Sequence, residues 1–146
     1  PAHLFTTGAN PVSCEAALAT LEMIEEEQLL EASLEKGDYV RQTMDRWITD
    51  YECIGDVRGK GLSIGIDIVS DPIQKTRDPE AALKICNYCF DKGVVIIAVA
   101  GNVLRFQPPL VISYDQLDYA LSTLEKAIQA LNRGDLDQYE IEGQGW

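Results

Sequence analysis

The sequence predicts an α+β domain in which helices pack on one face of a small, mostly antiparallel sheet. Three observations lead to this prediction. Residues 62–68 alternate between large apolar and small or polar side chains, which is typical of a strand with one buried face. Two stretches with helical spacing of apolar residues precede this strand. Short apolar strands and helical stretches then alternate to the end of the domain.

The first helix is predicted to begin at Asn10-Pro11, because Asn is a good N-cap and Pro suits the first helical position. It extends to about Glu27, and its first turns are apolar nearly all round. Such a helix has to be covered on several sides, which a domain of this size can hardly do alone. We therefore expect another domain or subunit to lie against it. A second helix follows from about Leu29 to Ile48, and Gly37 weakens it in the middle.

The remaining elements are predicted from the spacing of apolar residues and from the capping and turn residues that separate them. The stretch 51–57 is the expected hairpin partner of strand 62–68, and a helix begins at Asp78-Pro79. Two short strands come next, and the capping box Ser113-x-x-Gln116 opens the last helix, which ends before Gly134. The predicted ranges are 79–90 for the third helix, 94–98 and 103–106 for the two strands, and 135–146 for a polar tail.

Charge and composition exclude several classes of partner. The 146 residues carry a formal net charge of -12, which disfavours nucleic acid and anionic membranes. No apolar run approaches the roughly 18 residues that span a bilayer. The chain begins at Pro1 without an initiator Met and without a signal-peptide pattern. We therefore expect a part of a longer, cytoplasmic protein.

The four cysteines are expected to be reduced cytosolic thiols. Cys86 and Cys89 form one CxxC pair, whereas Cys14 and Cys53 stand alone, and His3 is the only histidine. A structural zinc site needs four ligands in paired spacing, so neither zinc nor a redox dithiol is favoured. No metal site is predicted.

Gly59-Lys60-Gly61 suggests a nucleotide loop but is better explained as a hairpin turn. The dinucleotide fingerprint needs a glycine where Ile64 stands, and a phosphate-binding loop needs Ser or Thr after the lysine. The stretch also joins two predicted strands instead of leading into a helix.

Two places suit an anion. The segment 6–11 puts two hydroxyl groups and a glycine before a helix N-terminus, which attracts phosphate or carboxylate, although ordinary capping explains it too. Arg105 stands in an apolar strand, where a guanidinium is either exposed at an edge or paired, because burying it without an anion is costly. That partner is either an internal carboxylate, from Asp67 or Asp56, or the carboxylate of a ligand.

Three segments together resemble one family. The segment 6–11 (TTGANP) resembles the TFGGNP segment of class III, 4-aminobutyrate aminotransferase-like enzymes. The segment 54–62 (IGDVRGKGL) resembles their strand-turn-strand, and the segment 101–110 (GNVLRFQPPL) resembles their GNVLR-x-x-PPL segment. The three occur in the family's order, and the resemblance extends to about Arg133.

The resemblance implies the C-terminal small domain of a fold-type I enzyme that uses pyridoxal 5'-phosphate and forms a homodimer or tetramer. Residues 1–134 would form this domain, and 1–27 would include the linker and the helix that contacts the missing large domain. Thr6 would bind the phosphate of the partner subunit's cofactor, and Arg105 the substrate α-carboxylate. Thr7 and Ala9 replace the family's Phe and Gly, so the packing of this loop is expected to differ.

The family's Schiff-base lysine, its aspartate at the pyridine nitrogen and its ring-stacking residue all precede Thr6, so this chain alone is expected to be inactive. The expected whole enzyme transfers an amino group between an amino acid or amine, 4-aminobutyrate-like, and a 2-oxo acid. Racemisation, epimerisation or dialkylglycine decarboxylation is the alternative within the family. A stand-alone, non-catalytic assembly or binding module is the alternative of another class. The amino donor and acceptor do not follow from the sequence.

Overall fold

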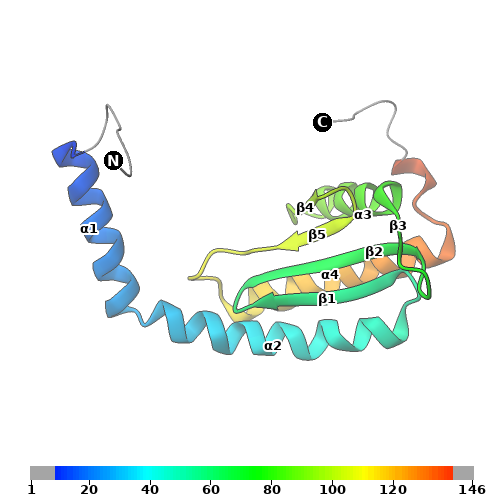
Figure 1. Cartoon of the computed structure of the whole chain (residues 1–146), viewed down its shortest axis with the longest axis horizontal. Coiled ribbons are helices and arrows are strands. Elements are labelled where there is room, and N and C mark those ends of the chain that lie inside the picture. Colours follow the sequence, from blue (N-terminus) through cyan, green and yellow to red (C-terminus); the bar gives the residue numbers. More distant parts are fainter. Residues whose placement is uncertain (1–8, 140–146) are drawn as a thin grey trace.

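The computed structural model describes residues 9–139, and within them the predicted α+β class is confirmed (Figure 1). The first helix ends near an abrupt corner, where Gln28 adopts the left-handed conformation with φ of 52°. In chain order the elements are α1 (Pro11–Glu26), α2 (Leu29–Asp50), β1 (Ile54–Lys60), β2 (Ser63–Asp71), β3 (Thr76–Arg77), α3 (Pro79–Asp91), β4 (Ile97–Val99), β5 (Val103–Phe106), α4 (Tyr114–Arg133) and a single 3-10 turn (Asp137–Tyr139).

The helix boundaries follow the capping residues. Asn10 accepts hydrogen bonds from the backbone N–H groups of Val12 and Ser13, and Asp78 accepts one from Ala81. Ser113 and Gln116 form the predicted capping box, with both reciprocal bonds present. Each cap satisfies backbone donors that the first turn of a helix leaves free. The predicted helix starts are therefore confirmed.

The sheet has the strand order β1-β2-β5-β4, and every neighbouring pair is antiparallel. Strand β3 pairs with the C-terminal end of β2, at Val69 and Asp71. Because β2 and β4 are both antiparallel to β5, they are parallel to each other. The connection through α3 thus leaves a gap between them, which β5 fills.

Two strands differ from the sequence-based expectation. Strand β4 starts only at Ile97, because Val94 donates its backbone N–H to Cys89 at the end of α3 instead of joining the sheet. Strand β3 is not among the strands that the sequence predicts. Its two residues pair with β2 only through an irregular register, which has no signature in a sequence pattern.

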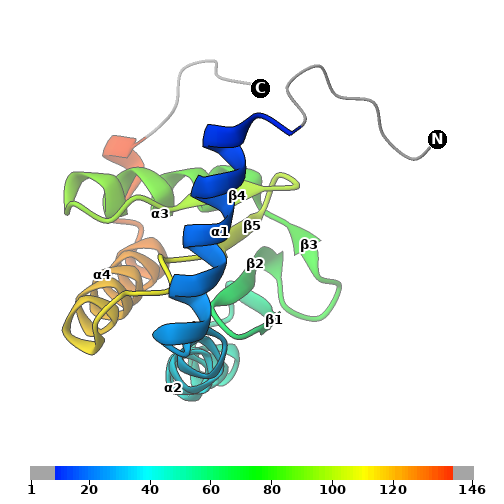
Figure 2. The same cartoon turned by 90° about the vertical axis from the view of Figure 1, so that its left-hand side faces the viewer.

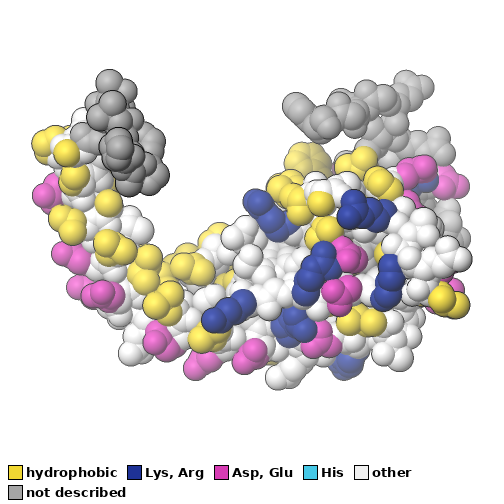
Figure 3. All heavy atoms as spheres, viewed as in Figure 1, with side chains coloured by type: hydrophobic (Ala, Val, Ile, Leu, Met, Phe, Trp, Pro, Cys, Tyr) yellow, Lys and Arg dark blue, Asp and Glu magenta, His cyan; other side chains and the backbone are white. Residues whose placement is uncertain are grey.

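One face of the sheet is buried and the other is open. The alternating isoleucines of β2 are at most 1% exposed, and Leu104 and Phe106 of β5 continue the same layer. Helices α2, α3 and α4 cover this face (Figure 2). The opposite face is not covered by any element among residues 9–139. It carries basic and acidic side chains close together (Figure 3).

Helix α1 stands away from the rest of the domain (Figure 1). None of its residues is buried, and the exposed fraction of its large apolar side chains is high. The values are 79% for Val12, 52% for Leu18, 58% for Leu21 and 53% for Met23. Within the described residues the cover that the sequence predicts for this helix is not present, and Figure 3 shows the apolar side chains along it. None of the helices within 9–139 is long and apolar enough to cross a membrane.

The β1–β2 turn packs tightly against the middle of α2 at Gly37. A Cβ atom on Gly37 would lie 2.4 Å from the carbonyl oxygen of Gly61 and 2.6 Å from its Cα. The hydroxyl oxygen of Ser33, one turn earlier, accepts a hydrogen bond of 3.3 Å from the N–H of Leu62. Gly37 is therefore needed for a backbone contact, and its cost to helix propensity is secondary. The antiparallel register of β1 and β2, with Lys60 opposite Ser63, confirms that Gly59-Lys60-Gly61 belongs to a hairpin.

Replacing Gly37 by Ala is expected to destabilise the chain by about 1–3 kcal/mol, because a methyl group would push the β1–β2 turn off α2. Helix propensity alone predicts the opposite sign, a gain of about 1 kcal/mol. Urea unfolding followed by circular dichroism measures the difference. The matched control is Asp38→Ala at the next, exposed position, which should change stability by less than about 0.7 kcal/mol. A raised midpoint for Gly37→Ala would contradict the contact.

Candidate functional site

Arg105 lies on the open face of the sheet. Its strand, β5, is internal, and its register partners are Gly65 on β2 and Ile97 on β4. The neighbours Leu104 and Phe106 point into the core, so the alternation of the strand turns Arg105 outward. Its side chain makes no hydrogen bond or ion pair with any residue of the described chain. The strand thus presents an unpaired guanidinium.

A hollow of about 790 Å³ lies beside Arg105, where β4 starts. Most of its lining is apolar, and none of the described residues that line it is a lysine. The lining residues are Gly93, Val94, Val95, Ile96, Ile97, Arg105, Phe106, Gln107, Pro108, Pro109, Val111, Ile112, Asp115, Gln116, Tyr119 and Ala120. An apolar hollow with one free cation suits the carboxylate end of a small organic molecule.

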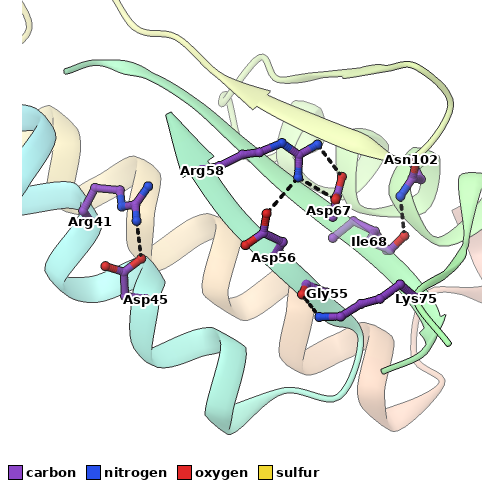
Figure 4. A network of polar contacts seen from close by, with 9 residues as sticks. All are labelled: Arg41, Asp45, Gly55, Asp56, Arg58, Asp67, Ile68, Lys75 and Asn102. Atoms are coloured by element: carbon purple, nitrogen blue, oxygen red, sulfur yellow. Dashed lines mark hydrogen bonds and ion pairs between the residues drawn. The ribbon is translucent and has the colours of Figure 1, made fainter. Parts of the chain in front are cut away.

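The two carboxylates considered as internal partners of Arg105 bind Arg58 instead (Figure 4). Nη1 of Arg58 donates to Asp67 at 2.6 Å and to Asp56 at 3.0 Å, and Nη2 donates to the second oxygen of Asp67 at 3.1 Å. These hydrogen bonds raise the pKa of Arg58 well above its usual range, with Asp67 the larger cause and Asp56 the next. The internal pairing of Arg105 is therefore not observed.

A buried amide fixes the start of β5. The side-chain NH₂ group of Asn102 donates a hydrogen bond of 2.8 Å to the carbonyl of Ile68, and Asn102 is only 3% exposed. The backbone N–H of Ile68 in turn donates to the carbonyl of Asn102 at 3.0 Å. Gly101, with φ of 90°, supplies the left-handed turn before it. Asn102 thereby sets the register that brings Arg105 opposite Gly65.

Sequence reasoning did not single out Arg58, Gly65 or Asn102 as contributors to the site. A signal existed for each, because all three lie in or beside the family-like segments 54–62 and 101–110. A second open-face contact, from Lys75 to the carbonyl of Gly55, also escaped prediction, since it depends on the position of β3.

The other predicted anion site falls largely outside the described residues. Thr6, expected to bind phosphate, precedes residue 9, and so does His3. At the N-terminus of α1, the side chain of Asn10 already accepts from Val12 and Ser13. These two N–H groups are therefore occupied by capping.

The cysteines are free thiols. Desolvation by burial raises the pKa of Cys53 and Cys86 to about 11 and that of Cys89 to about 12. Cys14, on α1, is exposed. No group of three or more His, Cys, Asp or Glu within the described ranges could hold a metal ion. The CxxC pair thus lacks the lowered pKa that a reactive dithiol needs.

The sequence matches the family model described as aminotransferase class-III over residues 1–128. The chain belongs to the class III aminotransferase family. It is 49% identical over 147 aligned residues to isoleucine 2-epimerase of Lentilactobacillus buchneri, covering 100% of this chain and 33% of that protein. It is 43% identical to a leucine/methionine racemase of Thermococcus litoralis, covering 90% of this chain and 30% of that protein.

A solved structure in the same family has the same fold. An amine transaminase from an uncultivated Pseudomonas species, in its PLP-bound form, superposes with a TM-score of 0.82 at 31% identity. The superposition covers 88% of this chain and 29% of that one. The predicted α+β domain of a fold-type I enzyme and its cofactor, pyridoxal 5'-phosphate, are thereby confirmed. The chain spans about a third of the length of the curated relatives that it matches.

Thiol labelling tests the described burial of the cysteines. At pH 8 iodoacetamide is expected to alkylate Cys14 first, because about 0.1% or less of a thiol with a pKa near 11 is ionised at that pH. Cys53, Cys86 and Cys89 should react only after unfolding in urea, as peptide mass spectrometry would show. Equal rates at Cys86 and Cys14 in the folded chain would contradict this burial.

Proposed function

We propose that this chain is the C-terminal part of an enzyme that acts on α-amino acids, in which Arg105 binds the substrate carboxylate. The observation that carries the proposal is the Arg105 guanidinium, which has no partner among residues 9–139 and lies beside an apolar hollow. A bidentate pair with a carboxylate satisfies the planar fork of an arginine, and water or a monodentate partner does so less well. Family membership supplies the amino-acid chemistry that such a site would serve.

Arg105 would act by binding and orientation. Pyridoxal phosphate, when bound, supplies the electron sink that makes a bond to the α carbon labile. Arg105 is held on an internal strand, so its pairing with the substrate carboxylate would fix the orientation of the bonds to the α carbon. This would be a contribution to catalysis by positioning. Asn102 supports it, because its buried hydrogen bond to Ile68 sets the register of β5 on β2.

We further propose that the missing large domain of the enzyme carries the Schiff-base lysine and covers α1. The apolar residues of α1 support this view, since a free module would leave them in water. For the same reason, the exposed apolar residues of α1 argue against a stand-alone binding module. Thr6 would contact the phosphate of the partner subunit's cofactor in a homodimer, as the family resemblance implies. The four free thiols favour a reducing, cytoplasmic compartment.

Two reactions are candidates. Inversion of the α carbon of an aliphatic amino acid is supported by similarity to the isoleucine epimerase and the leucine/methionine racemase. Transamination, 4-aminobutyrate-like or otherwise, is supported by similarity to the amine transaminase. We favour inversion, because the identity to the epimerase extends over the whole chain at 49%.

The longer enzyme that contains this chain should convert L-isoleucine to its C2 epimer in the absence of any 2-oxo acid. Inversion returns the amino group to the same carbon skeleton, whereas transamination needs an acceptor. Chiral chromatography with and without added pyruvate separates the two reactions. L-Leucine and L-alanine extend the test to other side chains. Turnover that occurs only with pyruvate, and yields a 2-oxo acid, would assign transamination instead.

In the same enzyme, Arg105→Ala is expected to lower kcat/KM for the preferred amino acid by about 100-fold, or about 3 kcal/mol of lost charged hydrogen bonds. Arg105→Lys should do nearly as much harm, since an ammonium cannot replace the planar fork. Melting temperatures should change little, because Arg105 makes no ion pair with the described chain.

The matched control is Arg46→Ala, which removes an exposed arginine from α2. It should leave both kcat/KM and melting temperature near those of the parent. A destabilised Arg105→Ala enzyme with normal kcat/KM would exclude the carboxylate-binding role and favour a structural one.

A further inference from the structure

The open face of the sheet brings two carboxylates into direct opposition. Asp56 on β1 and Asp67 on β2 are register partners in the antiparallel pair. Like charges at opposed positions repel each other. Arg58, two residues along β1 from Asp56, turns back and contacts both carboxylates (Figure 4). One cation therefore serves two anions.

The contact with Asp67 is the stronger of the two. Arg58 approaches both oxygens of Asp67, at 2.6 and 3.1 Å, and only one oxygen of Asp56. The side chain of Asp67 is 25% exposed, compared with 51% for Asp56. The paired forks of a guanidinium and a carboxylate leave Asp67 little capacity to accept another strong donor.

Asp67 and Arg105 lie on the same open face of adjacent strands. Gly65 is opposite Arg105 on one side and opposite Arg58 on the other, and Asp67 is two residues farther along β2. Asp67 is thus diagonal to Arg105 across the β2–β5 pair. Diagonal neighbours in antiparallel sheets are about 7–8 Å apart, within reach of a long side chain. Gly65 adds no side chain between them, and the neighbouring side chain on this face is that of Val103, whose Cγ1 would lie 3.1 Å from a Cβ on Gly65.

We propose that Arg58 is a positioning residue that holds Asp67 away from Arg105 and so keeps Arg105 free for the substrate carboxylate. This inference rests on the proposed role of Arg105. Without Arg58, Asp67 would lose its ion-pair partner and would be repelled by Asp56. A movement of the Asp67 side chain toward Arg105 would give it a new cation and take it away from Asp56. The Asp67–Arg105 pair would then compete with the substrate for the same guanidinium.

The size of the effect follows from competition. Only enzyme molecules with a free Arg105 bind substrate. The apparent dissociation constant is therefore the intrinsic constant divided by the fraction of such molecules. A partly exposed pair is modest in strength. Arg58→Gln should therefore raise KM roughly three- to tenfold. The value of kcat should be unchanged, because saturating substrate displaces Asp67.

A double-mutant cycle in the longer enzyme tests this. KM and kcat for the preferred amino acid, with L-isoleucine as the first probe, are measured for the parent, Arg58→Gln, Asp67→Asn and the double variant. The rise in KM caused by Arg58→Gln should disappear in the Asp67→Asn background, since the neutral amide is a poor competitor. A purely structural role of Arg58 would give the same loss in both backgrounds.

Two further variants keep the outcomes distinct. Arg58→Lys retains the charge without the fork, so it should give an intermediate KM even if Arg58→Gln fails to fold. Arg41→Gln is the matched control, because it breaks a comparable Arg–Asp pair of 3.1 Å on α2 and should not change KM.

An unchanged KM in both Arg58 variants, or a rise that persists in the Asp67→Asn background, would overturn the inference. Arg105→Gln separates the two levels of the proposal. If that variant leaves KM unaltered, the carboxylate role of Arg105 fails. If it raises KM while the Arg58 variants do not, only the positioning role of Arg58 fails.

Discussion

The burial of one face of the sheet is the constraint on which the rest of the structure depends. Isoleucines of β2 and the large apolar residues of β5 pack against α2, α3 and α4. Because side chains alternate along a strand, this packing forces the intervening residues onto the opposite face. Gly65, Asp67, Val103 and Arg105 are among those residues. The hydrophobic core therefore decides where the candidate site lies, without itself touching a ligand.

The charges on the open face divide into one satisfied group and one unsatisfied group. Arg58 is enclosed by two carboxylates, whereas Arg105, across Gly65, has none within the described chain. Paired charges contribute order to the sheet, while an unpaired guanidinium is available to an external anion. Arginine thus has different roles at two positions of one register row, because Asp56 and Asp67 both pair with Arg58 and neither pairs with Arg105.

Helix α1 is regular, but it is not packed into the core of the domain. Its N-cap and its internal hydrogen bonds are regular, so its formation is locally favourable. Its apolar side chains nevertheless remain in solvent, which is unusual for a contiguous helical surface. The chain spans about a third of the length of the curated relatives that it matches. Local sequence defines the helix, whereas the cover that we propose for its apolar side chains comes from outside the described residues.

The sequence by itself determined the elements that depend on local chemistry. The caps at Asn10, Asp78 and Ser113 and the alternation in β2 were readable because each acts over a few residues. Arg105 was also recognised, since an arginine in an apolar strand is anomalous in any context. Tertiary structure alone decided which carboxylates bind which arginine, because strand register sets distances between residues far apart in the chain. The same holds for Gly37, whose close backbone contact with Gly61 leaves no room for a Cβ atom and does not follow from helix propensity. Thr6, by contrast, lies outside the described residues, so its role stays a prediction from the sequence.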